Sequence, residues 1–166
     1  MTANKEVQVK TEGNTLILSR EFDAPRDLVF KAYSDCEHLS RWWAPAGWSL
    51  THCNMDFRTG GRWHYCMSSD TEDMQSWGLA DYSEINSPNQ IKYTDHFSDE
   101  EGNPNEDMPS ADIVVELNEK DGITTLVSRT TYASQDDLQQ ILEMGVVQGV
   151  GETWDKLDTM LAEEQA

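Results

Sequence analysis

Hydrophobic and polar residues alternate along most of the chain between positions 48 and 133. A period of two is typical of strands that bury one face. The short turn sequences RTGG, NSPN and KDG separate the alternating stretches, so neighbouring strands should pair antiparallel. The pattern predicts a polar loop over 98–110 and strands over 15–24, 48–57, 62–69, 76–85, 90–97, 111–119 and 122–133.

Two other stretches have a helical period. Residues 25–43 place apolar side chains at spacings that suit one or two short helices, with Pro25 in the first turn. Residues 134–165 predict one long helix that begins at Ser134, a favourable N-cap. The apolar stripe of this helix recurs about every fourth residue, at Leu138, Leu142, Val146, Val150, Trp154, Leu157 and Leu161.

This order of elements predicts an α+β fold. An antiparallel sheet has an apolar face to cover, and the C-terminal helix is the only predicted element long enough to cover it. We therefore expect a curved antiparallel sheet of about six or seven strands wrapped around the long helix, with two short helices. Residues 15–166 should form a single domain, and the polar segment 1–14 should be flexible.

The hairpin around Thr59 and Gly60 also predicts a register. With the turn centred there, the numbers of paired residues sum to about 118, and one face is clearly the more apolar. His52, His64 and Cys66 then share the outer face, where two histidines and a cysteine could bind zinc. Their spacing matches no recognisable metal site, so we interpret them as surface side chains and expect no metal. The inner face is expected to carry Cys53, Met55, Phe57, Trp63, Tyr65 and Met67.

The composition excludes some partners. The chain has 31 acidic and 12 basic residues, which gives a formal net charge of −19. Binding to nucleic acid or to anionic membranes depends on basic residues, so we expect neither partner. An acidic surface keeps a protein soluble, and it is also common in proteins adapted to a salty cytoplasm.

The compartment is predicted from the N-terminus and the cysteines. No secretory signal is visible, and Cys36, Cys53 and Cys66 are an odd number at unrelated spacings. Disulfides are rare in a reducing compartment. We therefore expect three reduced thiols and a cytoplasmic protein.

Catalytic motifs give no positive signal. The chain has no nucleophile elbow, no phosphate-binding glycine loop and no dinucleotide fingerprint. Paired carboxylates carry no information in so acidic a chain. We expect no catalytic residue and no cofactor, and we favour a non-enzymatic protein.

The long helix and the last strand suggest a void between them. Gly145, Gly149 and Gly151 weaken the helix, and they either allow close approach to the sheet or leave space against it. Ser128 and Thr130 are in phase with apolar neighbours, which places hydroxyls on the inner face. Buried hydroxyls need partners, and a ligand or a cavity water would provide them.

Three of the six tryptophans lie in the stretch HLSRWWAPAGWSL (38–50), where the chain bends. A core seldom needs such large apolar side chains where the chain bends, so Trp42, Trp43 and Trp48 mark a region of interest.

Several stretches together resemble a known family: FDAPRDLVFKAYSDCEHLSRWWAP, MDFRTGGRWHYCM, WGLADYSEINSPNQIKYTDHFSDEEGNP and TTYASQDDLQQILEMGVVQGVGETWDKLDTMLAE. Over about residues 15–163 the chain is similar to the bacterial homologues of the activator of the ninety-kilodalton heat-shock chaperone ATPase. These proteins belong to the START-like, polyketide-cyclase-like (SRPBCC) superfamily. The resemblance implies the helix-grip fold of the birch-pollen allergen, with a cavity between the long helix and the sheet. It also implies that Trp42, Trp43 and Trp48 lie at the mouth of that cavity, where they either plug the end of the sheet or present aromatic surface to a ligand. Relatives in the superfamily bind lipids, sterols, hormones or polyketides, and some are enzymes.

The residues and the resemblance together favour binding of a small, mostly hydrophobic molecule in that cavity. A cyclase or hydrolase using the same cavity is an alternative, and it would need a buried ionisable group such as Tyr65, Tyr82 or Asp81. A regulator of a chaperone ATPase that acts by protein–protein contact is another, and a homodimer is left open. The candidate cavity residues are Trp42, Trp43, Trp48, Phe57, Trp63, Tyr65, Tyr82, Tyr93, Ser128, Thr130, Leu142, Val146, Gly149 and Thr153.

Overall fold

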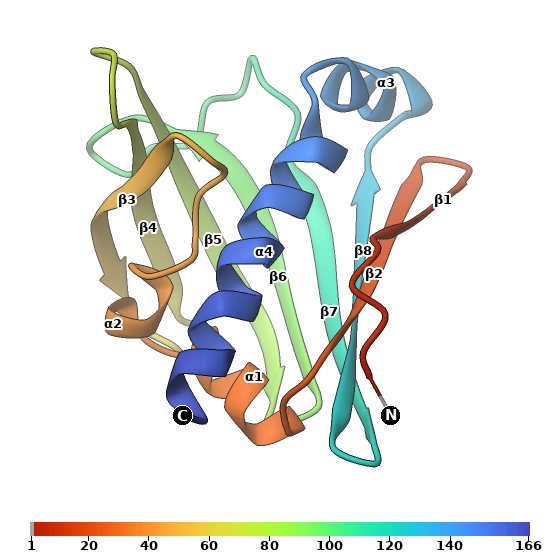
Figure 1. The fold of residues 1–166 in the computed structure, drawn as a ribbon. Coiled ribbons are helices and arrows are strands. Elements are labelled where there is room, and N and C mark those ends of the chain that lie inside the picture. The colour runs from red at the N-terminus through yellow and green to blue at the C-terminus, as the bar shows by residue number, and fades with distance from the viewer. Residues whose placement is uncertain (1) are drawn as a thin grey trace.

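A curved antiparallel sheet surrounds a long C-terminal helix in the computed structural model, which describes residues 2–166 (Figure 1). Within these residues the sheet has eight strands in the order β1-β2-β8-β7-β6-β5-β4-β3 and is not closed. The predicted α+β helix-grip class is confirmed. The strands are β1 Gln8–Glu12, β2 Thr15–Phe22, β3 Trp48–Met55, β4 Arg62–Ser69, β5 Gln75–Asn86, β6 Gln90–Ser98, β7 Ala111–Lys120 and β8 Ile123–Tyr132. The helices are α1 Arg26–Ala32, α2 Cys36–Leu39, α3 Gln135–Glu143 and α4 Val146–Glu164.

Seven of the strands follow the predicted alternation, and the predicted hairpin register is present. Met55 pairs with Trp63 and Cys53 pairs with Tyr65, before the register shifts at Leu50. Strand β1 was not predicted, because it lies in the segment expected to be flexible. All five of its residues are exposed, so it has no buried face and no alternation to reveal it. It pairs with β2 along its whole length.

The predicted long helix over 134–165 is wrong in one respect, because the structure divides it into α3 and α4. Ser134 does cap the start, where its side chain accepts a hydrogen bond from the backbone N–H of Asp137 at 3.1 Å. The break comes at Gly145, whose φ of 86° lies in the left-handed region that favours glycine. The apolar stripe continues through this residue, so periodicity alone did not reveal the turn. None of the helices within residues 2–166 has the length and hydrophobicity needed to cross a bilayer.

Helix α4 is fixed to the sheet by its C-terminal half. Trp154, Leu157 and Met160 are buried there, and the Trp154 ring packs edge-on against Phe22 with a centroid separation of 6.2 Å. Arg20 is buried on β2 and forms ion pairs with two carboxylates of α4, at 2.9 Å to Asp155 and 3.4 Å to Asp158. These contacts hold one half of the helix tightly against β2.

Helices α1 and α2 close the end of the sheet nearest the C-terminus of α4 (Figure 1). A disulfide joins Cys36 of α2 to Cys53 of β3, so the expectation of three reduced thiols is wrong. Only the fold brings these two cysteines together, because 17 positions separate them in the chain and they form no motif. Disulfides persist mainly in oxidising compartments, so the cysteines do not support the cytoplasmic prediction. Cys66 remains a free, buried thiol.

Candidate ligand cavity

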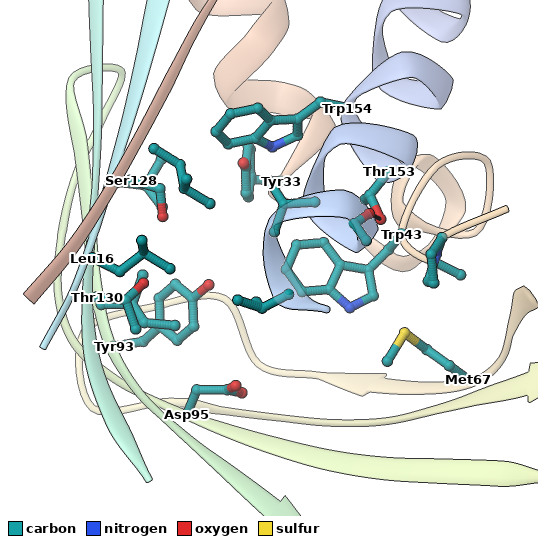
Figure 2. Close-up of a pocket in the computed structure, with 18 of the residues that line it drawn as sticks. Leu16, Tyr33, Trp43, Met67, Tyr93, Asp95, Ser128, Thr130, Thr153 and Trp154 are labelled. Carbon is teal, nitrogen blue, oxygen red and sulfur yellow. Dashed lines mark hydrogen bonds between the residues drawn. The ribbon is translucent and has the colours of Figure 1, made fainter. Parts of the chain in front are cut away.

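A cavity of about 290 Å³ lies between the first half of α4 and the inner face of the sheet (Figure 2). The helix contributes Val146, Gly149, Val150, Thr153 and Trp154. Tyr33 at the end of α1 also lines the cavity, as does the loop after α2, called the rim loop below, through Trp43, Ala44 and Pro45. The sheet contributes Leu16, Leu18, Tyr65, Met67, Tyr93, Asp95, Ile113, Val115, Ser128, Thr130 and Tyr132.

The space exists because the inner face of α4 is less fully buried against the sheet along its first half than along its second half. No residue from 146 to 153 is fully buried, although this half also faces the sheet. A Cβ atom at Gly149 would come no closer than 4.0 Å to its nearest heavy-atom neighbour, on Pro45. Gly151 instead lies near Val7, outside the cavity, and Gly145 forms the helix break. Gly149 is thus the one helix glycine among these three that lines the cavity.

Helix α4 also anchors the rim loop that follows α2. The ammonium group of Lys156 donates hydrogen bonds to the backbone carbonyls of Pro45, at 3.1 Å, and Trp48, at 2.9 Å. Within the same segment, the half-buried Trp43 ring packs edge-on against Trp63 at 4.9 Å and against Tyr65 at 6.0 Å. The rim is therefore held from the helix side and from the sheet side.

The three tryptophans of residues 38–50 have three different environments. Trp42 is 1% exposed and its indole N–H donates to the carbonyl of Ala32 at 3.0 Å, so it plugs the core. Trp43 lines the cavity. Trp48 lines a separate, shallower depression near the junction of α3 and α4. Plugging of the core therefore describes Trp42, and Trp43 is the indole that borders the cavity.

Eight of the fourteen candidate residues line the cavity: Trp43, Tyr65, Tyr93, Ser128, Thr130, Val146, Gly149 and Thr153. The other six do not: Trp42, Trp48, Phe57, Trp63, Tyr82 and Leu142. Trp63 stacks against Tyr65 at 4.2 Å, and Phe57 packs against Tyr82 at 5.2 Å, in the aromatic core. Leu142 belongs to α3, which the break at Gly145 separates from the cavity face of α4.

Asp95 of β6 is a lining residue that the sequence interpretation missed. It lines the cavity, and its Oδ1 accepts a hydrogen bond from the Tyr65 hydroxyl at 3.1 Å. Burial raises the pKa of Asp95 to about 7, and the hydrogen bond from Tyr65 offsets only part of this effect. The alternation in QIKYTDHF places Asp95 in phase with Tyr93 and Ile91, so the same reasoning applied to β6 would have found it.

Asp81, suggested above as an ionisable cavity group, lies outside the cavity. Its carboxylate forms an ion pair with Arg62 at 3.0 Å and lies 3.6 Å from Nε2 of His96, all on the outer face of the sheet. Tyr82 is close enough for the charge of Asp95 to contribute to raising its pKa, after burial, but it does not line the cavity. The ionisable group that faces the void is Asp95.

The outer face of β3 and β4 carries the two histidines considered for zinc. The rings of His52 and His64 are 5.5 Å apart, and His64 stacks on Trp77 at 5.0 Å. Cys66, expected at the surface, is only 1% exposed, because it pairs with His52 on one side and with Trp77 on the other. Among residues 2–166 no group of three or more His, Cys, Asp or Glu side chains could hold a metal ion.

Residues 23–162 match the model of the family described as Activator of Hsp90 ATPase homolog 1-like protein. The chain belongs to this family. Membership confirms the resemblance given by the sequence motifs and agrees with the helix-grip architecture. Among the curated proteins, no sequence matches significantly.

Solved structures of bacterial proteins share this fold along nearly the whole chain. Protein Ms6760 from Mycobacterium smegmatis is 33% identical with a TM-score of 0.86, over 94% of this chain and 97% of that one. A protein from Arthrobacter aurescens is 26% identical with a TM-score of 0.87, over 94% and 91%. A Staphylococcus epidermidis protein is 30% identical with a TM-score of 0.82, over 95% and 94%. Their similarity supports the family assignment and the fold.

Proposed function

We propose that this family member binds a small, mostly apolar molecule in the cavity between α4 and the sheet. The observation that carries the proposal is an interior space of about 290 Å³ that is lined mainly by aliphatic and aromatic side chains. Protein interiors are normally close-packed, so an unfilled space of this size costs stability, and a bound ligand would offset that cost. Ligand pockets typically measure about 300–1,000 Å³, and this one is at the small end. A one- or two-ring compound or a short chain is therefore favoured over a sterol.

Polar groups in the lining support a ligand rather than a packing defect. Ser128, Thr130 and Asp95 face the space from the sheet, in a lining that is mainly aliphatic and aromatic. A few convergent polar groups in an apolar pocket are typical of sites that orient a small molecule.

The test is a thermal-shift screen with small aromatic and short-chain compounds, with two matched glycine variants. A ligand at a hundredfold excess over its Kd should stabilise the protein by about 2.7 kcal/mol. Gly149→Leu fills the cavity and should abolish the shift, whereas Gly151→Leu, on the same helix but outside the cavity, should retain it. A screen with no stabilising compound, or shifts that persist equally in both variants, would overturn the proposal.

Asp95 favours a second candidate, an enzyme of the cyclase or hydrolase kind. A carboxyl group in a cleft with a pKa near 7 can accept or donate a proton at neutral pH. An Asp95→Asn variant that still binds the substrate but loses turnover would identify this activity. Binding without turnover in the unsubstituted protein would argue against the enzyme and support the binding function alone.

The family description also names a chaperone activator, but no comparable observation favours that role. A protein-interaction site would use a contiguous apolar patch. The exposed large hydrophobic side chains described within residues 2–166 are Val9 on β1, Met74 just before β5 and Met144 between α3 and α4. Ligand binding therefore comes first.

A further inference from the structure

The carboxylate of Asp95 is only partly satisfied by the protein. Its one side-chain hydrogen bond within residues 2–166 comes from the Tyr65 hydroxyl, at 3.1 Å to Oδ1. No Lys, Arg or His in the same residues lies within ion-pair distance of it. Figure 2 shows Asp95 at the end of the cavity away from Trp154. One carboxylate oxygen is thus free for a ligand.

The surroundings of this carboxylate are aromatic and otherwise uncharged. Trp43, Tyr65 and Tyr93 line the same cavity, and aromatic ring faces attract cations. Asp95 is the only charged side chain among the described lining residues. The net charge of −19 also draws cations toward the molecule and repels anions.

We propose that the ligand is an amphipathic amine, whose apolar body fills the cavity and whose ammonium group pairs with the carboxylate of Asp95. This assignment rests on the proposed binding function and specifies its ligand class. An ammonium supplies the charge and the hydrogen-bond donors that the carboxylate lacks, whereas a carboxylic acid would be repelled. A neutral alcohol could donate one hydrogen bond but would leave the charge uncompensated.

Without a ligand, the ionised carboxylate of Asp95 is partly desolvated and has no cationic partner. Pairing with a bound ammonium group would offset this unfavourable desolvation. Burial raises the pKa of this carboxyl to about 7, and a bound cation would restore the ionised form. The other titratable groups near Asp95 are tyrosines of four strands, and α4 contributes no charged side chain to the described lining. These tyrosines are Tyr65, Tyr82, Tyr93 and Tyr132. Burial, together with the nearby charge of Asp95, raises the pKa of each hydroxyl above its usual value. All four tyrosines therefore stay neutral near pH 7.

The experiment compares matched amine and alcohol probes by calorimetry. The pairs are 2-phenylethylamine with 2-phenylethanol and n-hexylamine with n-hexanol, at pH 6 and pH 8. The amines, with a pKa of about 10, stay protonated at both values. We expect each amine to bind at least tenfold more tightly than its alcohol at pH 8. Its affinity should fall about tenfold at pH 6, because the ionised fraction of a group with pKa 7 falls from about 0.9 to about 0.1.

Two aspartate variants make the test specific to this site. Asp95→Asn should remove both the amine preference and its pH dependence, while the amide oxygen can still accept from Tyr65. Asp81→Asn is the matched control on the outer face of the sheet and should retain both. An amine that binds no better than its alcohol at pH 8, or a preference that survives in Asp95→Asn, would overturn the assignment. Cavity binding of neutral compounds without that preference would leave the proposed function intact, whereas failure of all compounds would remove both.

Discussion

The two halves of α4 face the same sheet, but only the second half packs closely against it, whereas the first half borders a cavity. Residues 154–161 bury Trp154, Leu157, Met160 and Leu161 at no more than 4% exposure. Residues 146–153 bury none fully and border the cavity. The comparison shows that one helix can be closely packed along one half and border a cavity along the other. Substitutions in the two halves should therefore have different consequences.

The largest expected effect on stability comes from truncating a buried side chain in the closely packed second half of α4. Leu157→Ala should destabilise the protein by about 3 kcal/mol, because a fully buried leucine leaves a cavity that the packed surroundings cannot fill. Val150→Ala removes side-chain volume that already faces a void, and it should cost less than about 1 kcal/mol. Urea denaturation of both variants measures the difference. Equal costs would contradict the distinction between the halves.

A smaller effect on stability is expected at Asp95, which lines the cavity from the sheet opposite the first half of α4. In the unfolded chain this carboxyl ionises near pH 3.9, whereas in the folded protein it stays protonated up to about pH 7. The folded state therefore binds more protons between these values, and the free energy of unfolding falls as the pH rises through this window. Asp95→Asn removes the penalty and should stabilise the protein at pH 8 by on the order of 2 kcal/mol.

The control for this prediction is the same comparison at pH 4. There Asp95 is protonated in the folded state and half-protonated when unfolded, so the stability difference between the two proteins should nearly vanish. Denaturation curves at pH 4 and pH 8 give both values. A difference independent of pH would show that the stabilisation has another cause.

The smallest effect concerns the glycines at the start of α4. Gly149→Ala should stabilise the protein by about 0.7 kcal/mol, because alanine loses less backbone entropy in a helix and its methyl group meets no close neighbour. Gly145→Ala should have the opposite sign and cost about 1 kcal/mol, since the φ of 86° is unfavourable for alanine. Thermal denaturation of the pair tests the assignment, and the same sign for both would refute it.

The sequence predicted the fold well where local pattern and turn chemistry agree. Seven strands, the register of the first hairpin and the short helices follow from alternation, glycine turns and capping residues. The break at Gly145 was missed because the apolar stripe continues through it, and β1 because its residues are all exposed. The Cys36–Cys53 disulfide depends on α2 meeting β3 in space, which no spacing rule encodes.

The site was predictable only in part, for a similar reason. The inner-face positions Tyr65, Tyr93, Ser128 and Thr130 follow from strand periodicity. Trp63 and Tyr82 share that periodicity but lie under other aromatic rings, so membership of the inner face does not decide whether a side chain reaches the void. That depends on how far α4 stands from each strand, which is a tertiary property.

The open sheet has a consequence for how the family diversifies. Strands β1 and β3 are its free edges, and a helix rather than another strand occupies the hollow between them (Figure 1). The helix takes no part in the hydrogen bonds between strands. Substituting the side chains on its inner face therefore changes the shape of the interior and leaves the hydrogen bonds of the sheet intact. Homologues can thus keep one backbone while the interior beside the helix differs in size and polarity, so a ligand class proposed for one member does not carry over to another.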